Sequence, residues 1–334
     1  RFTRGWPRWS VALLAVALAV YWLPSPINPK PHNLKGPPPA LVGLLAVNTQ
    51  LQRGRRLFAG KLHGPESFTA DDNGNVYTGT VDGKLWRIGP DDSLTLVTHM
   101  GQNLPECGSS TDYELVCGRP HGVRLDRHGQ LIVADSYFGL YRVDPRTGEK
   151  TRLVANTEGA RGVPFAFLNG LEISSQAGII YFTDSSSRWG RRHVRLEVRQ
   201  GNCVRSFNEL ENKCLVLGPC LLADFTRISK FSVFPCGSDL FSVAHLLTPF
   251  LATVFGMWEL ATIFVSGVMP LSWFNLLLPY YGLVLELGPN GEIVRTLHDP
   301  EGRLTWAVSD VFQHRGRTYL GSTDLPFLPV LEGW

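Results

Sequence analysis

Residues 74–88 read GNVYTGTVDGKLWRI, and residues 129–143, GQLIVADSYFGLYRV, follow the same pattern. Two further stretches match it: residues 178–189, GIIYFTDSSSRW, and residues 316–330, GRTYLGSTDLPFLPV. Each stretch begins with a glycine, runs through β-branched and aromatic residues, breaks at Gly, Ser or Asp, and then resumes. This pattern predicts a β-hairpin in each stretch. Hairpins that recur at intervals of roughly 50 residues are typical of a β-propeller.

The spacing of these hairpins also predicts how many there are. Two more units fit in the gap between the third and fourth stretches. Residues 218–231, GPCLLADFTRISKF, match the second unit through Asp224. The remaining unit is expected near residues 260–280, where we find no hairpin pattern. The sequence therefore predicts an all-β, six-bladed β-propeller over residues 60–334.

An uncharged apolar segment, residues 9–23, lies near the N-terminus and reads WSVALLAVALAVYWL. Arg1, Arg4 and Arg8 precede it, and its aromatic ends suit the two interfaces of a bilayer. It is shorter than the ~20 residues that usually cross a membrane, so a cleaved signal peptide is the alternative. We expect one uncleaved transmembrane helix of single-pass type II topology, with residues 1–8 as a cytoplasmic remnant. The C-terminal domain would then be extracellular or lumenal, and the lipid bilayer would be a partner.

The segment that follows is rich in proline. Residues 24–39 contain seven prolines, which rule out a regular helix or central strand and favour a stiff, extended spacer. We assign residues 24–59 to this Pro-rich linker. The formal net charge of +3 is small for a chain of 334 residues and includes no basic run, so nucleic acid is not an expected partner.

Short polar turns precede the hairpins at similar offsets. Glu66 lies in GPES, His121 in RPHG and Asn169 in LNG, and the same offset before the fourth unit falls between Asn208 and Asn212. In a propeller, equivalent positions before the inner strands meet at the mouth of the central channel. A carboxylate and carboxamides at one point form a hard-oxygen site, for which calcium is the natural ion. The alternatives are that Glu66 and Asn169 only cap turns, and that His121 is a hydrogen-bonded core residue.

The six cysteines do not have the spacing of a zinc site; they are Cys107, Cys117, Cys203, Cys214, Cys220 and Cys236. If the chain is exported, Cys107 and Cys117 are the pair that we expect to form a disulfide, closing a short loop between two repeats. Free buried thiols are the alternative. The pairing of the other four cannot be predicted from the sequence.

The same stretches resemble the strictosidine synthase-like family. KLHGPESF, CGRPHGV, DSYFGLYRVD and FLNGLEIS carry the resemblance up to about residue 192, and LVLEL, LHDPEG and YLGS carry it over residues 281–329. The resemblance implies a six-bladed propeller on an N-terminal membrane anchor. Relatives such as the paraoxonases bind calcium in the channel and hydrolyse aryl esters or lactones. The resemblance therefore implies a calcium-dependent, arylesterase-like hydrolase acting on a small aryl ester or lactone.

Individual residues can be assigned by the same resemblance. Glu66 matches an acidic calcium ligand of the family, Asn169 matches an asparagine ligand, and His121 matches the histidine at the mouth of the active site. Cys107 and Cys117 match a family disulfide. In the shortened loop LENKCLVLGP, Asn212 is assigned the place of a further asparagine ligand.

The middle of the chain departs from the family pattern. Residues 246–268, LLTPFLATVFGMWELATIFVSGV, are long and apolar enough for a second membrane helix, although Pro249 and Glu259 count against it. No Asp-Asn pair is found where the fifth blade should supply calcium ligands. Our hypothesis is that part of residues 193–280 is divergent and that the fifth blade is damaged. The alternative function is a non-catalytic, membrane-tethered propeller that binds a partner and has an incomplete metal site. Strictosidine synthase activity is not expected, because no late glutamate matches the one used by those enzymes.

Overall fold

The structure is a computed structural model. It describes part of the chain, and the fold is that of this part. The described residues are 15, 40–160, 162–174, 178–186, 280–306 and 308–333, and the backbone of 203–208, 213–219 and 231–232. The chain divides into two compact units. One contains Ala40–Cys236 and Tyr280–Trp334, and the other contains Arg1–Pro39 and Gly237–Pro279. Only the first is described below.

Both predicted membrane segments, residues 9–23 and residues 246–268, lie outside this described part apart from Ala15. Within the described residues, no helix combines the length and the apolar character needed to span a bilayer. The hairpin unit expected near residues 260–280 also lies outside them.

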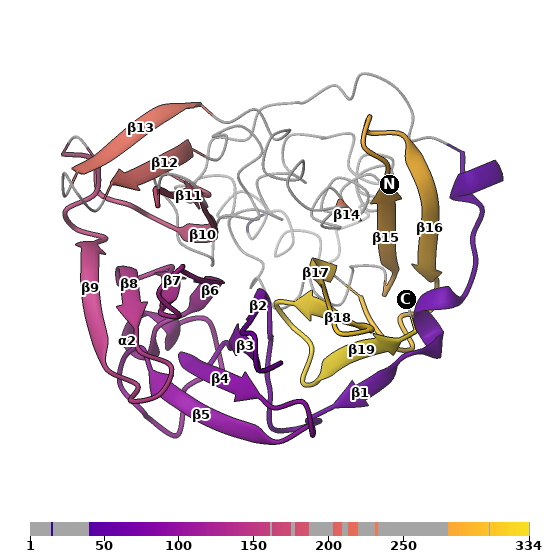
Figure 1. Cartoon of the computed structure of the whole chain (residues 1–334), viewed down its shortest axis with the longest axis horizontal. Helices are drawn as coiled ribbons and strands as arrows, with labels where there is room; N and C mark the ends of the chain where they lie inside the picture. The colour runs from indigo at the N-terminus through magenta and orange to yellow at the C-terminus, as the bar shows by residue number, and fades with distance from the viewer. Residues whose placement is uncertain are drawn as a thin grey trace, which may run out of the picture. The chain divides into compact units, whose positions relative to one another are not determined.

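The described residues of the first unit form an all-β structure with four four-stranded antiparallel sheets and one three-stranded antiparallel sheet (Figure 1). Sheet 1 contains β2 (Phe68–Ala70), β3 (Val76–Gly79), β4 (Lys84–Ile88) and β5 (Leu94–His99); sheet 2 contains β6 (Pro120–Leu125), β7 (Leu131–Asp135), β8 (Gly139–Val143) and β9 (Lys150–Ala155). Sheet 3 contains β10 (Leu168–Ile173), β11 (Ile180–Asp184), β12 (Cys203–Asn208) and β13 (Lys213–Pro219). Sheet 4 contains β14 (Phe231–Ser232), β15 (Gly282–Leu287) and β16 (Ile293–Asp299); sheet 5 contains β17 (Val308–His314), β18 (Arg317–Ser322), β19 (Leu328–Glu332) and β1 (Arg55–Leu57). The short helices are η1 (Gly43–Leu45), η2 (Gln50–Arg53) and α2 (Glu114–Cys117).

The first strands of the sheets lie next to one another. Strand β17 contacts β2, β2 contacts β6, and β6 contacts β10. Figure 1 shows these strands on the inner side of the unit, with β5, β9 and β13 on its outer side. Successive four-stranded sheets that meet through their first strands are consistent with a β-propeller.

Three of the predicted hairpins are confirmed: β3–β4, β7–β8 and β18–β19 are antiparallel neighbours joined by short turns. All five residues of β7 are buried, because neighbouring sheets cover both of its faces. This explains why the strand is a continuous apolar run rather than an alternating one. Hydrophobic clusters fill the spaces between sheets. Phe165 and Phe182, for example, pack edge to face with ring centroids 5.4 Å apart.

Two of the predicted hairpins are wrong in their boundaries. Strand β11 pairs with β10 on one side and with Cys203–Asn208 on the other, so the strand that follows it in the sheet lies beyond residue 189. Gly218, which was expected to open a hairpin, lies in β13 and faces Val204, while Asp224 lies outside the described residues. The sequence pattern assumes tight turns. Sheet 3 instead joins its second and third strands by a long connection.

Sheet 5 combines β1, the first described strand, with β17, β18 and β19, the last three described strands. Strand β1 pairs with β19, with Arg55 opposite Val330 and Leu57 opposite Leu328. The β-rich unit therefore includes residues 55–57, which fall within the range predicted as linker. The pairing leaves no local pattern, because the two strands are far apart in sequence and β1 has only three residues, two of which are arginines.

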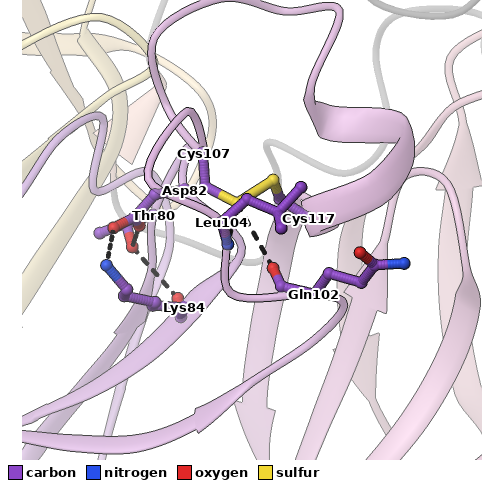
Figure 2. Close-up of a disulfide and its surroundings, with 7 residues drawn as sticks. All are labelled: Thr80, Asp82, Lys84, Gln102, Leu104, Cys107 and Cys117. Atoms are coloured by element: carbon purple, nitrogen blue, oxygen red, sulfur yellow. Dashed lines mark hydrogen bonds and ion pairs between the residues drawn. A yellow bond between two sulfur atoms is a disulfide. The ribbon is translucent and has the colours of Figure 1, made fainter.

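Cys107 and Cys117 form a disulfide in the loop between β5 and β6, with Cα atoms 5.8 Å apart (Figure 2). The loop packs against sheet 1, where a Cβ on Gly83 would lie 1.9 Å from the carbonyl oxygen of Cys117. Gly83 also has a positive φ of 73°, which glycine adopts without strain. The disulfide therefore fixes the chain two residues before Arg119, at the start of sheet 2.

We expect the double variant Cys107→Ser/Cys117→Ser to lose about 3 kcal/mol of unfolding free energy, from the entropy of a short closed loop. Urea unfolding of the oxidised wild-type protein and of the double variant measures the difference. The control is dithiothreitol, which should lower the stability of the wild type far more than that of the double variant. Equal urea midpoints for the two oxidised proteins would contradict the prediction.

Candidate active site

The predicted site residues lie where the inner strands begin. In sheet 2, Pro120 pairs with Asp135 and the register shifts before Gly122; in sheet 3, Leu168 pairs with Asp184 and the register shifts before Leu171. His121 and Asn169 occupy these two irregularities. Such bulges change the direction of a side chain at the end of a strand and are frequent beside active sites.

Two buried aspartates hold these strand ends in place. Asp135 accepts hydrogen bonds from the backbone N–H groups of Arg119 (2.8 Å), Tyr137 (3.0 Å) and Phe138 (3.0 Å). Burial raises the pKa of Asp135 to about 6, and these backbone hydrogen bonds act in the opposite direction. Asp184 accepts from the N–H of Phe167 at 2.9 Å. Both carboxylates thus serve to order the backbone at the strand ends.

The backbones of sheets 2 and 3 approach each other at the level of the candidate site. A Cβ on Gly122 would lie 2.6 Å from the carbonyl oxygen of Asn169. Only glycine therefore fits between His121 and the next residue of β6, and the close approach brings the starts of β6 and β10 together.

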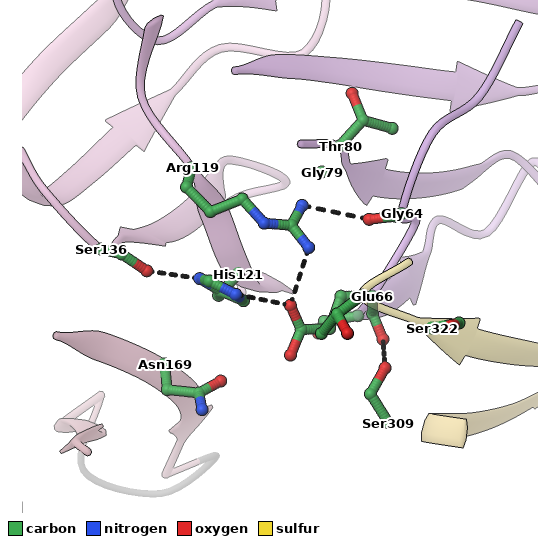
Figure 3. A network of polar contacts seen from close by, with 12 residues as sticks. Gly64, Glu66, Gly79, Thr80, Arg119, His121, Ser136, Asn169, Ser309 and Ser322 are labelled. Carbon is green, nitrogen blue, oxygen red and sulfur yellow. Dashed lines mark hydrogen bonds and ion pairs between the residues drawn. The ribbon is translucent and has the colours of Figure 1, made fainter. Parts of the chain in front are cut away.

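Glu66, Arg119 and His121 form a buried cluster at this level (Figure 3). Oε2 of Glu66 is 3.0 Å from Nη2 of Arg119 and 2.8 Å from Nε2 of His121. The side chain of Arg119 is 0% exposed, that of His121 is 2% exposed and that of Glu66 is 11% exposed. Arg119 also donates to the carbonyl oxygen of Gly64 at 3.0 Å. One oxygen of the Glu66 carboxylate thus contacts nitrogen atoms of two side chains, Arg119 and His121, at the start of the neighbouring sheet.

Ser136 sets the orientation of the imidazole. Its hydroxyl donates to the carbonyl oxygen of Leu168 at 2.6 Å, and its oxygen also contacts Nδ1 of His121. Because the hydroxyl proton is used for Leu168, Nδ1 is the donor in the contact with Ser136. The ring also packs edge to face on Phe167, with centroids 5.2 Å apart. Nδ1 therefore carries a proton, and Nε2 is the nitrogen directed at Glu66.

Asn169 and Ser309 lie around the same cluster. Asn169 donates through Nδ2 to Oγ of Ser185 at 3.1 Å, and Figure 3 shows its amide oxygen on the side nearer Glu66. Ser309 donates to the carbonyl oxygen of Glu66 at 3.2 Å. Ser309 follows the first residue of β17, as His121 and Asn169 follow the first residues of β6 and β10.

Asn212, the third predicted metal ligand, lies outside the described residues. The strands on either side of it, β12 and β13, are the third and fourth strands of sheet 3. Glu66, His121 and Asn169 instead lie before or within the first strands of their sheets. The place of Asn212 in the repeat therefore differs from theirs.

Two residues of the cluster were not predicted from the sequence, namely Arg119 and Ser136. Arg119 directly precedes an inner strand, and a cationic residue beside an otherwise apolar run was a usable signal. Ser136 gave no signal, because serine after a strand is common in turns.

The oxygen atoms of the cluster are ligands of the kind that hard cations prefer. A carboxylate (Glu66) and an amide oxygen (Asn169) are ligands that suit calcium, whereas zinc prefers His and Cys. Among the residues that the structure describes, no group of three or more His, Cys, Asp or Glu side chains is arranged to hold a metal. The residues therefore fit calcium in kind, with Arg119 as a competing positive charge on the same carboxylate.

Comparison with known proteins gives consistent matches. The sequence profile of the family described as "Strictosidine synthase-like, N-terminal" matches residues 43–88. Adipocyte plasma membrane-associated protein of Salmo salar is 31% identical to this chain, covering 96% of the chain and 87% of that relative. The Homo sapiens protein of that name is 32% identical, covering 95% and 88%. The strictosidine synthase-like protein 10 of Arabidopsis thaliana is 28% identical, covering 80% and 85%.

Proposed function

Because this chain belongs to the strictosidine synthase-like family, we propose that it is a membrane-anchored, six-bladed propeller that hydrolyses aryl esters or lactones in a calcium-dependent reaction. Residues 9–23 would form the single-pass type II anchor, with the propeller extracellular or lumenal. The name of the animal relatives, adipocyte plasma membrane-associated protein, supports attachment to a membrane.

The observation that supports hydrolysis is the buried contact between Glu66 and His121, 2.8 Å long, at the start of the inner strands. Histidine is the most frequent general base in enzymes, and a base is effective when neighbouring groups fix its orientation. Here Glu66 and Ser136 hold the imidazole from opposite sides.

Each residue can be given one task in the reaction. Ser136 holds Nδ1 as a donor, so Nε2 of His121 is the atom that accepts the proton of the attacking water. In this structure Nε2 lies 2.8 Å from Oε2 of Glu66, a contact that needs a proton between the two atoms, because a bare imidazole nitrogen and a carboxylate oxygen are both acceptors. Nε2 can therefore accept a proton from water only after that proton has been released to solvent and Nε2 has separated from the carboxylate. Burial of the cluster keeps bulk water away and strengthens its electrostatic interactions.

Glu66 and Asn169 are the residues that we propose as calcium ligands. Bound calcium would polarise the ester carbonyl and stabilise the negative charge that develops on its oxygen. The remaining ligands would have to come from positions outside the described residues or from water, since calcium takes about six to eight oxygens.

The test is hydrolysis of phenyl acetate and dihydrocoumarin by the full chain in detergent, with millimolar calcium or with EGTA. We expect hydrolysis above the buffer background with calcium, loss of hydrolysis in EGTA, and recovery when calcium is added back. A rate that EGTA does not change would reject the calcium dependence. No hydrolysis under any of these conditions would reject the enzyme.

One observation favours the second candidate function, a non-catalytic propeller that binds a partner. Protein groups already bind Oε2 of Glu66 and both ring nitrogens of His121. A resting cluster of this kind is also what a purely structural network would look like. The two functions differ in the assay above, because the partner-binding propeller gives only the background rate.

A further inference from the structure

Two cations would bind the same carboxylate of Glu66, namely the guanidinium of Arg119 and the proposed calcium ion. Arg119 lies 3.0 Å from Oε2 of Glu66 and has a side chain that is 0% exposed. The proposed calcium site uses the same carboxylate. The charges of Glu66 and Arg119 cancel, and the other proposed ligand, Asn169, is neutral. A calcium ion that approaches this carboxylate therefore meets no net negative charge from the three residues.

The fold holds Arg119 in this place from several directions. Its backbone N–H is bound by Asp135 at 2.8 Å, and its Nη1 donates to the carbonyl oxygen of Gly64 at 3.0 Å. The disulfide at Cys117 lies two residues before it. A guanidinium fixed in this way cannot simply swing into solvent when a cation arrives.

We propose that Arg119 acts as a built-in competitor of calcium for Glu66, so that the wild-type protein binds calcium only at millimolar concentrations. This inference rests on the proposed function, because it assumes that Glu66 is the acidic ligand. Calcium sites in extracellular modules bind at roughly 10⁻⁴ to 10⁻³ M, and tighter sites carry more ligand charge. In this chain the guanidinium removes the effective charge of the carboxylate. Calcium occupancy would then follow the high extracellular or lumenal concentration of the ion.

The decisive variant is Arg119→Met, which keeps the length and apolar stem of the side chain and removes its charge. We expect its calcium dissociation constant to fall at least about tenfold below that of the wild type, since a unit charge a few ångströms away in a buried site has a large effect. Isothermal titration calorimetry with calcium chloride on the full chain in detergent measures it. Calcium-dependent shifts of the thermal midpoint provide a second readout that does not depend on activity.

The matched control is Arg124→Met. Arg124 is on β6, the strand that Arg119 precedes, but its Nε pairs with Glu172 at 3.1 Å, its Nη1 donates to Ser67, and none of its hydrogen bonds within the described residues goes to Glu66. We expect this variant to keep the calcium affinity of the wild type to within about threefold, because its charge is partly exposed and screened. An equal gain in both variants would show a general charge effect and would overturn the role of Arg119.

The remaining outcomes separate this inference from the proposed function. Micromolar calcium binding by the wild type would overturn the inference and leave the calcium site standing, as would equal affinities in the wild type and Arg119→Met. No calcium binding by either protein would reject the site itself, and the inference with it. If Arg119→Met does not fold without calcium, its refolding in millimolar calcium supports the inference, and failure to fold in calcium leaves the wild-type titration to decide it.

Discussion

His121→Gln is expected to lower kcat/KM for phenyl acetate by at least about 100-fold, which is the usual contribution of a general base. Glutamine has a similar size and can still form hydrogen bonds to Ser136 and Glu66. It cannot accept and release a proton near neutral pH, so the variant isolates proton transfer from packing. The measurement is the steady-state rate with calcium present, together with a thermal melt that shows the variant is folded.

His128→Gln is the matched control for this experiment. His128 is exposed in the turn before β7, and its Nε2 accepts a hydrogen bond from the neighbouring Arg127. We expect its kcat/KM to equal that of the wild type. If His121→Gln also retained kcat/KM to within about threefold, His121 would have a structural role only.

Glu66→Ala is expected to destabilise the fold by about 3–5 kcal/mol, because it leaves the fully buried guanidinium of Arg119 without its carboxylate. Glu66→Gln should cost distinctly less, since an amide oxygen can still accept from Arg119. Urea unfolding monitored by tryptophan fluorescence compares the three proteins. The difference between the wild type and Glu66→Gln reports the charge of the pair, and the difference between Glu66→Gln and Glu66→Ala reports the hydrogen bond and packing that the amide retains.

A double variant separates two causes of the stability loss in Glu66→Ala, namely the unpaired charge of Arg119 and the packing lost with the Glu66 side chain. Glu66→Ala/Arg119→Met removes both charges, so it should recover part of the stability lost in Glu66→Ala. If Glu66→Gln were as stable as the wild type, or if Glu66→Ala lost less than about 1 kcal/mol, the ion pair would not be the stabilising interaction that its burial indicates.

The hairpins could be predicted from the sequence because their information is local. A turn glycine such as Gly83 and the apolar run of β7 lie within one short window. The pairing of β1 with β19 and of β11 with β12 could not be predicted in the same way. In both cases the partner lies beyond a long connection, and the strand is recognised only by its neighbour in space.

The residues of the candidate site also differ in whether local sequence could reveal them. Glu66, His121 and Asn169 were found because they occupy similar positions in successive repeats. The role of Arg119 depends on a contact with the preceding sheet, and that of Ser136 on a contact with the following one. Repeat position gives the location of a residue but not its partner. The ion pair between Glu66 and Arg119, on which our proposal about calcium affinity depends, became visible only in three dimensions.

The pairing of β1 with β19 has a consequence for biosynthesis. The strand made first in sheet 5 has no partner until the ribosome has delivered the last strand of the chain. The nascent polypeptide thus keeps an open edge until β19 is made, and chaperones have that period in which to bind it. A premature stop codon a few residues before Leu328 would remove β19 and leave β1 unpaired, so such truncated products are expected to be degraded.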